Sequence, residues 1–339
     1  MLKHHYVVGA IIAAYIHKCF ITKLDKKIDL IIMCDSSIYD NYGDTLKLFF
    51  DQVKLISLDE FSLDSKYQFA KEKYQSWVSF ATNKWKCLKF DNYDKVLFMD
   101  IDILPCKKGF YDIFKLNTPA VKRVAMLPLV VPKCGELING TVGDSFHDYV
   151  TKKIIKIGSL DGGLVLLNPS KDSYRKYRKF TKKIFDNGIY SSHLSFPDET
   201  SLFYYLFKTS KVYSICDNYL KIPWDVKDLA HTLAYNFNSF VKPWIKGRAI
   251  SWDEELLWHD IYDTIRGRYN IGKIDELYNE SIKEHYTKVF LILEPYKQKK
   301  RYYCNDISKI NPNNVNTIIS GRTVKKYGIL DVSELKEFL

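Results

Sequence analysis

Segments of strand length and segments of helix length alternate through the first two thirds of the chain, and this alternation constrains the fold most strongly. Short apolar runs predict strands, and longer runs with helical spacing predict helices. Such a chain is expected to build an α/β sandwich with a mainly parallel sheet. The expected strands are Ile28–Cys34, Val53–Leu58, Lys95–Met99, Val124–Leu127, Gly163–Leu167 and Lys211–Ile215, and the expected helices are Tyr6–Phe20, Tyr74–Phe90, Ser170–Gly188 and Asp198–Phe207.

The pattern changes after about Trp244, where helical stretches follow one another without intervening strands. A capping-box sequence begins at Ser251 and precedes an apolar run. We therefore expect an α/β domain over residues 1–250 and a mainly helical extension over residues 251–339. The expected elements of the extension are the helix Trp252–Arg266, the helix Asp275–Leu293, the loop Lys297–Pro312 and the short helix Val332–Leu339.

Net charge and cysteine usage limit the partners and the compartment. The charge of +11 suits an acidic partner such as a phosphorylated small molecule, but the basic residues are scattered and no nucleic-acid-binding signature accompanies them. Specific nucleic-acid binding is therefore not expected. The seven cysteines lie far apart without a CxxC pair, so we expect neither a zinc site nor disulfides, and a reducing, cytoplasmic location.

The apolar segment Tyr6–Phe20 is the one stretch that could be mistaken for a membrane or export signal. Its apolar core is too short to span a bilayer, and it lacks the small-residue cleavage pattern of a signal peptide. We expect a buried helix, no transmembrane segment and no signal peptide.

An acidic pair stands where the strand Lys95–Met99 ends. Asp100 and Asp102 follow this strand directly, and ligands bind at the carboxyl ends of strands in open α/β sheets. Two close carboxylates repel each other unless a cation or a shared proton lies between them. The pair therefore either holds a hard divalent cation or includes a group that performs covalent chemistry.

Two further segments have the composition of ligand-binding loops. Leu160–Ser170 (LDGGLVLLNPS) contains a polar Asp-Gly-Gly turn, then a buried strand, then a helix cap. Tyr235–Trp244 (YNFNSFVKPW) places small polar residues ahead of Lys-Pro-Trp, so that backbone can approach a ligand closely. We expect these segments to converge with the acidic pair.

Taken in chain order, the acidic pair and these two segments resemble motifs of the glycogenin-like retaining glycosyltransferases of family 8. The resemblance runs from about Tyr6 to Trp244. That family has the GT-A fold, a Rossmann-like nucleotide-sugar-binding sandwich, in which a DxD motif holds Mn²⁺ on the donor diphosphate. The chain looks closest to divergent members carried by large DNA viruses of insects. The resemblance implies an enzyme that moves a hexose from a UDP-sugar to an unknown acceptor, using Mn²⁺ or Mg²⁺.

The resemblance also assigns roles to individual residues. Tyr6 of YVVGA matches a tyrosine that lies against uracil, and Lys84 matches a lysine that contacts the donor. Asp198-Glu199 falls where the family has Asp-Gln at the reacting centre, and NFNSFVKPW resembles HFxGxxKPW. The implied donor-binding residues are Tyr6, Lys84, Asp100, Gly162, Ser239 and Lys242, the implied metal ligands are Asp100, Asp102 and Asn236, and the implied catalytic groups are Asp198 and Asp161.

Departures from the family pattern bear on metal and mechanism. Asn236 replaces the histidine ligand, so we expect weaker Mn²⁺ binding or a shift toward Mg²⁺. Asp161 replaces an asparagine, and Ser239 replaces a glycine that lets backbone approach phosphate. Two retaining routes stay open: attack by Asp198 as a nucleophile, and front-face return within an ion pair.

Other functions compete with the transferase. Haloacid dehalogenase phosphatases also have a strand-end DxD motif, but they place threonine or valine where this chain has Leu104, so this alternative ranks low. A catalytically silent relative that acts as a nucleotide-sugar-binding module is the main alternative. The sequence leaves the donor sugar and the acceptor undetermined, and a homodimer is possible.

Overall fold

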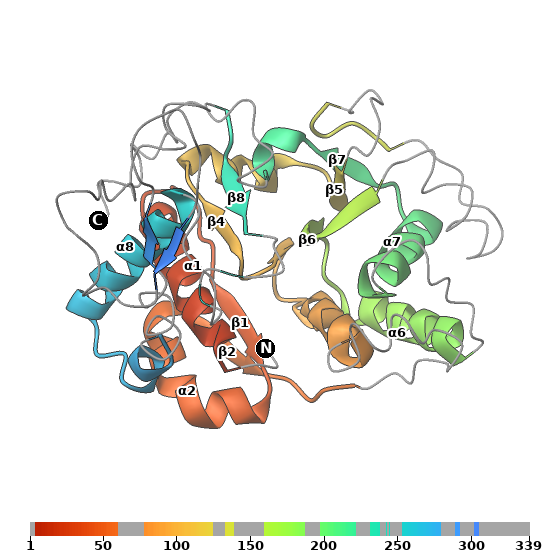
Figure 1. Cartoon of the computed structure of the whole chain (residues 1–339). Helices are drawn as coiled ribbons and strands as arrows, with labels where there is room; N and C mark the ends of the chain where they lie inside the picture. Colours follow the sequence, from red (N-terminus) through yellow and green to blue (C-terminus); the bar gives the residue numbers. More distant parts are fainter. Residues whose placement is uncertain are drawn as a thin grey trace. The chain divides into compact units, whose positions relative to one another are not determined.

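The computed structural model describes residues 4–59, 78–124, 133–138, 159–186, 197–221, 231–237, 242, 244, 253–278, 289–291 and 302–304 (Figure 1). These residues belong to two compact units. The first unit draws on Met1–Ile56, Ile101–Phe110 and Leu220–Leu339, and the second on Ser57–Asp100 and Tyr111–Tyr219. The two compact units show which residues pack together, but not which part of the chain folds independently. The division into a domain over residues 1–250 and an extension over residues 251–339 therefore stays a prediction.

The first unit is built around α1 (Tyr6–Ile21), which confirms the expected buried helix. This helix is apolar on nearly all sides, as a helix enclosed by other elements must be, and it contacts α2 (Ser36–Phe49), β4 (Ile103–Pro105) and α8 (Asp253–Arg268). Helix α2 joins the parallel strands β1 (Ile31–Cys34) and β2 (Gln52–Leu55). At the start of α2, the Asp35 side chain accepts a hydrogen bond from the Ile38 amide at 3.2 Å, an N-cap that ends β1 and begins the helix.

Strand β4 pairs with β8 (Ala234–Asn236) in the antiparallel sense, so that Ile103 lies opposite Asn236. A second antiparallel pair joins β9 (Val289–Leu291) to β10 (Tyr302–Cys304). This pair corrects two expectations. Strand β9 lies inside the helix expected at Asp275–Leu293, of which residues 275–278 are helical, and β10 lies inside the expected loop Lys297–Pro312. The run Val-Phe-Leu fits a strand as well as a helix, and the pairing with Tyr-Tyr-Cys decides between them. The expected helix Val332–Leu339 lies outside the described residues.

The second unit contains a mixed sheet in the order β3 (Val96–Met99), β6 (Ser159–Leu167), β5 (Ala120–Val124) and β7 (Tyr213–Ile215). Strand β6 pairs antiparallel with both neighbours, and β5 pairs parallel with β7. The 3₁₀ helix η1 (Val78–Lys89) and the helices α6 (Lys171–Asp186) and α7 (Pro197–Thr209) pack together, with α6 and α7 side by side in Figure 1. Two shorter 3₁₀ helices are η2 (Lys108–Lys115) and η4 (Asp217–Tyr219).

The strands of this unit differ from the expectations in three places. Strand β5 ends at Val124, where the expected strand Val124–Leu127 begins, and residues 125–127 lie outside the described residues. Strand β3 is half-buried, although its uninterrupted apolar run Val96–Met99 favours a buried strand. The expected Asp161-Gly162-Gly163 turn lies inside β6: Val121 of β5 faces Val165, whereas Lys122 faces Asp161, so residues 162–164 form a bulge.

The helix cap at Ser170 is confirmed, because the Ser173 amide donates to Ser170 Oγ at 3.1 Å. Gly188, expected to end this helix, lies outside the described residues, as do residues 74–77 of the expected helix Tyr74–Phe90. The α/β class predicted from the alternating pattern is confirmed. The described sheets are mixed rather than mainly parallel, because β1–β2 and β5–β7 pair parallel and the other described strand pairs are antiparallel. None of the helices that the structure describes is long and apolar enough to cross a membrane.

A disulfide joins Cys134 to Cys216 in the second unit, which corrects the expectation that the cysteines stay free. The two residues are 82 positions apart and meet because residues 133–138 run along β7. The Gly135 amide donates to the Ser214 carbonyl at 2.9 Å, and Gly135 has a φ of +78°, which glycine adopts without strain. Sequence spacing alone could not show this pair, because the contact depends on the sheet.

Candidate functional site

The predicted site residues fall into two groups, one in each compact unit. Ser239 lies outside the described residues. The acidic pair is itself divided, since Asp100 belongs to the second unit and Asp102 to the first. The group in the second unit is Lys84, Asp100, Asp161, Gly162 and Asp198, and the group in the first unit is Tyr6, Asp102, Asn236 and Lys242.

In the second unit, an ion pair joins Lys84 of η1 to Asp198 in the first turn of α7. Asp198 is 2% exposed, and its second oxygen, Oδ1, is buried without a hydrogen-bond partner. The Trp85 indole N–H donates to the Asp198 carbonyl at 3.0 Å, and Lys84 Nζ lies 4.9 Å from the centre of the Trp85 ring. These contacts fix both charged groups, so neither can move without disturbing the packing of η1 on α7.

Glu199, the residue after Asp198, lies directly over the Gly-Gly bulge of β6. The Gly162 amide donates to Glu199 Oε1 at 3.2 Å, and a Cβ at Gly162 would lie only 2.4 Å from Glu199 Cγ. A side chain at Gly162 would therefore displace Glu199. Glu199 was not among the predicted site residues, although it stands directly beside Asp198 in the sequence.

Gly163 brings two of the predicted acids together. The Gly163 amide donates to Asp161 Oδ1 at 2.8 Å, and its carbonyl accepts from the Asp100 amide at 2.8 Å. A Cβ at Gly163 would lie 3.0 Å from Asp161 Oδ1 and 3.1 Å from Asp100 Oδ2. The expectation that the acidic strand end and the Asp-Gly-Gly segment converge is confirmed for Asp100 and Asp161.

We call Lys84, Asp100, Asp161, Asp198 and Glu199 the carboxylate cluster. Burial, followed by the Asp198 charge, raises the pKa of Glu199 well above its usual value, with further contributions from Asp161 and Asp100 against the opposing effect of Lys84. Burial alone would lower the pKa of Lys84, but Asp198, Asp100 and Glu199 outweigh it and raise that pKa. One ammonium thus faces several carboxylates, so Glu199 tends to keep its proton.

In the first unit, Lys242 lies against Asp102. Lys242 Nζ donates to Asp102 Oδ2 and, at 3.0 Å, to the Phe237 carbonyl. The Phe237 amide donates to the Asp102 carbonyl at 2.9 Å, continuing the β4–β8 pairing by one residue. The sheet therefore holds both partners of the Lys242 ammonium.

Oxygen atoms in this group suit a hard cation. Asp102 Oδ1 and Asn236 Oδ1 are both buried and without a hydrogen-bond partner, and a buried oxygen in that state needs an explanation such as a bound ion or water. Among the described residues, however, no three His, Cys, Asp or Glu side chains are grouped as a metal site. The predicted ligand set of Asp100, Asp102 and Asn236 stays a prediction.

Trp244 packs against the YVVGA segment, so the first and the last of the predicted motifs are in contact. Its ring is 1% exposed, packs edge-on to the Tyr6 ring at 5.9 Å between ring centres, and stacks on Trp258 at 5.4 Å. A Cβ at Gly9 would lie 2.8 Å from this ring, so the YVVGA and Lys-Pro-Trp segments need each other to pack. Contact of Tyr6 with a nucleotide base stays a prediction.

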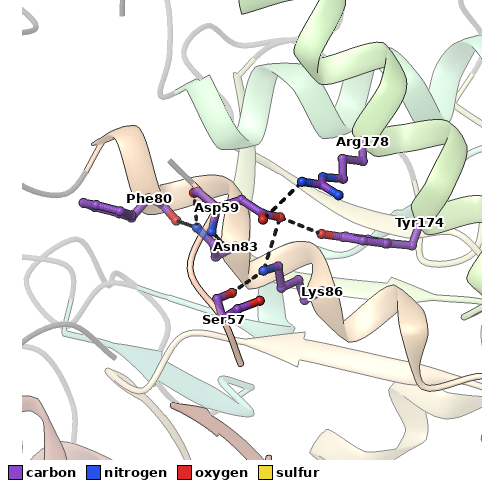
Figure 2. Close-up of polar contacts among 7 residues, drawn as sticks. All are labelled: Ser57, Asp59, Phe80, Asn83, Lys86, Tyr174 and Arg178. Atoms are coloured by element: carbon purple, nitrogen blue, oxygen red, sulfur yellow. Dashed lines mark hydrogen bonds and ion pairs between the residues drawn. The ribbon is translucent and has the colours of Figure 1, made fainter. Parts of the chain in front are cut away.

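A separate polar network surrounds Asp59 in the second unit (Figure 2). The Asp59 carboxylate is paired with Lys86 and Arg178, each at 3.2 Å, and accepts from the Tyr174 hydroxyl at 3.3 Å. Asn83 accepts from the Asp59 amide at 2.8 Å and donates to its carbonyl at 2.7 Å. This network ties the segment after β2 to η1 and α6, and no local sequence pattern predicts it.

Comparison with known proteins supports the fold. No family model matches the chain. An uncharacterized protein, R707, of Acanthamoeba polyphaga mimivirus is 24% identical over an alignment 297 residues long; the match covers 79% of this chain and 93% of R707. The solved galactosyltransferase LgtC, in complex with donor and acceptor sugar analogues, matches 78% of this chain and 97% of its own, with a TM-score of 0.51 and 11% identity.

The likeness to LgtC establishes the fold class: the chain has the GT-A fold, as the resemblance to family 8 implied. The mimivirus protein is a viral relative, and the expected closeness to proteins of insect viruses stays a prediction.

Proposed function

We propose that the chain is a retaining glycosyltransferase of the family 8 type that moves a hexose from a UDP-sugar to an acceptor. The observation that carries this proposal is the meeting of Asp100 and Asp161 at Gly163, in a chain with the GT-A fold. The Lys84–Asp198 ion pair adds support, because it belongs to the same carboxylate cluster.

Asp100, Asp102 and Asn236 would hold Mn²⁺ or Mg²⁺. When bound, the metal neutralises the charge that develops on the departing diphosphate. The buried, unpartnered oxygens of Asp102 and Asn236 support this assignment. The amide oxygen of Asn236 is a harder ligand than imidazole, which favours Mg²⁺ more than a histidine would.

Other residues of the chain would bind and orient the donor. Lys242 would place a point charge on the diphosphate, Tyr6 would lie against the base, and Ser239 and Gly162 would approach the donor with their backbone. Asp161 would accept hydrogen bonds from the donor sugar.

Asp198 is the catalytic group that the contacts constrain most. It is almost fully buried and paired with Lys84, which favours a role in fixing Lys84 over attack on a sugar carbon. We therefore prefer the front-face route, in which the leaving diphosphate assists the incoming acceptor.

The test measures UDP release from a panel of UDP-sugars with Mn²⁺ and with Mg²⁺. We expect one donor to be hydrolysed, with a loss of at least about 100-fold in Asp100→Asn and Asp102→Asn, since removing transition-state charge stabilisation has effects of this order. Asp112→Asn is the matched control, because this carboxylate is exposed and forms a surface ion pair with Lys115, which is also exposed and lies one helical turn away.

Full activity in the Asp102→Asn variant, or activity that survives removal of divalent metal, would contradict the proposal. Binding of UDP-sugars without turnover of any donor would instead support the silent binding module, which the Asn236 substitution and the Lys242–Asp102 contact also favour.

Partners and location complete the proposal. The acceptor is unknown, no specific nucleic acid is expected, and a homodimer is a prediction that light scattering can check. The proposed cytoplasmic location is opposed by the Cys134–Cys216 disulfide, because such bonds persist mainly in oxidising compartments.

A further inference from the structure

Lys242 forms an ion pair with Asp102, one of the carboxylates that the proposed function assigns to the metal. The side chains of Lys242 and Asp102 are 13% and 10% exposed, so their ion pair is largely shielded from water. Lys242 makes a second hydrogen bond, to the Phe237 carbonyl at 3.0 Å. The ammonium is therefore held by two oxygen acceptors on the β4–β8 strand pair, at a place where a divalent cation would also be attracted.

The two oxygens of Asp102 differ in their surroundings. Oδ2 accepts from Lys242, and Oδ1 is buried without a hydrogen-bond partner. A divalent cation that approached Oδ1 would come close to the Lys242 ammonium, and the two positive charges would repel each other in a shielded site. Asn236 contributes a neutral oxygen, which cannot offset that repulsion as a carboxylate would.

A diphosphate group would change this balance. Lysine is a compact point charge that phosphate oxygens bind well, and a diphosphate could replace both Asp102 Oδ2 and the Phe237 carbonyl as acceptors. With the ammonium transferred to phosphate, both oxygens of Asp102 would become available to the metal. The metal and the nucleotide would then each favour the binding of the other.

We propose that Lys242 competes with the metal for the Asp102 carboxylate. The Lys242 ammonium leaves Asp102 only when a nucleotide diphosphate accepts it. This inference rests on the proposed function, because it takes Asp102 as a metal ligand. Coupling of this kind is reciprocal: UDP raises the affinity for metal by the same factor by which metal raises the affinity for UDP. The device would keep the site from binding metal until a donor arrives.

The test counts free Mn²⁺ by electron paramagnetic resonance while the full chain is titrated with Mn²⁺, with and without saturating UDP. For the unaltered chain we expect weak Mn²⁺ binding alone and at least tenfold tighter binding with UDP. In Lys242→Met, Mn²⁺ alone should bind at least tenfold more tightly than in the unaltered chain, and UDP should improve this less than threefold.

Two further variants separate the contact from general effects of charge. Lys47→Met removes the same charge from an exposed position on α2, where Lys47 pairs with Asp44, and should behave like the unaltered chain. Lys242→Arg keeps a cation beside Asp102 and should keep Mn²⁺ binding weak without UDP. Near-ultraviolet circular dichroism checks that each variant is folded.

The outcomes distinguish this inference from the proposed function. If the unaltered chain binds UDP with Mn²⁺, but Lys242→Met binds Mn²⁺ alone as weakly as the unaltered chain, the competitor role is wrong and the proposed function stands. If the unaltered chain binds no UDP with either Mn²⁺ or Mg²⁺, both are overturned.

Discussion

Adding one methyl group at Gly9 tests whether α1 packs against the Trp244 ring in the first unit. A Cβ there would lie 2.8 Å from two carbons of the Trp244 ring and 2.9 Å from a third. Side-chain carbons do not approach one another so closely, so either α1 or the indole must move. Trp244 has little room, because it is buried and stacked on Trp258.

Two opposing effects set the size of the change. Replacing glycine by alanine inside a helix stabilises a protein by about 0.5–1 kcal/mol. Overpacking a filled core costs about 1–3 kcal/mol. The steric term is the larger one, so Gly9→Ala should lower the free energy of unfolding, by up to about 2 kcal/mol.

Gly43→Ala isolates the steric term. Gly43 lies in the middle of α2 in the same unit, and its nearest neighbour would be Tyr39 Cδ2 at 3.4 Å, an ordinary contact. Because the helix-propensity gain is the same for both substitutions, urea unfolding should separate Gly9→Ala from Gly43→Ala by about 1–3 kcal/mol, the full cost of overpacking. The prediction concerns a difference between two variants and does not depend on the absolute stability.

A double variant checks the cause. Trp244→Phe removes part of the ring that Gly9 faces, so Gly9→Ala should cost less in that background than in the unaltered chain. If Gly9→Ala is as stable as Gly43→Ala, the indole does not lie on α1, and our account of how YVVGA and Lys-Pro-Trp pack together is refuted.

Three further predictions concern the second unit. Burial, and then the Asp198 charge, raises the pKa of Glu199, so the folded chain keeps a proton that the unfolded chain releases near pH 4.5. The free energy of unfolding should therefore fall as pH rises above that value. In urea unfolding, Glu199→Gln should be more stable than the unaltered chain at pH 8 but not at pH 4. Lys84→Met leaves the buried Asp198 charge unpaired and should cost about 3–5 kcal/mol, whereas adding Asp198→Asn should recover most of this loss in a double-mutant cycle. Reduction should expose two additional thiols in a titration of the denatured chain, and Cys134→Ser should cost about 2–4 kcal/mol under oxidising conditions.

Local sequence patterns predicted most of the elements that form from neighbouring residues. The apolar run of α1 and the Ser170 cap of α6 depend on contacts within a few positions, and both are confirmed. The Asp-Gly-Gly segment was predicted as a turn because glycine and aspartate favour turns. It forms a bulge inside β6 instead, because pairing with β5 on one side and β3 on the other outweighs the local preference.

One part of the candidate site, the meeting of Asp100 and Asp161, was predictable from the sequence, whereas most of the side-chain contacts around it were not. The order of the motifs was enough to expect Asp100 and Asp161 at one place, and they meet at Gly163. The pairing of Lys84 with Asp198 and the raised pKa of Glu199 depend on how η1, α7 and β6 pack, which no spacing along the chain encodes. The Cys134–Cys216 bond was missed for the same reason.

The structure gives one physical reason for the glycines Gly9 and Gly162 of the predicted motifs: a side chain from another segment lies where their Cβ would be. Gly9 makes room for Trp244 in the first unit, and Gly162 makes room for Glu199 in the second. In each case a glycine in one motif segment is required by a large side chain that belongs to another segment far away in the chain. The resemblance to glycosyltransferases therefore rests partly on packing, since these pairs would be needed whether or not the chain turns over a sugar nucleotide. Charged residues that packing does not require, above all Lys242 and Asp102, are thus the ones whose substitution bears most directly on the proposed activity.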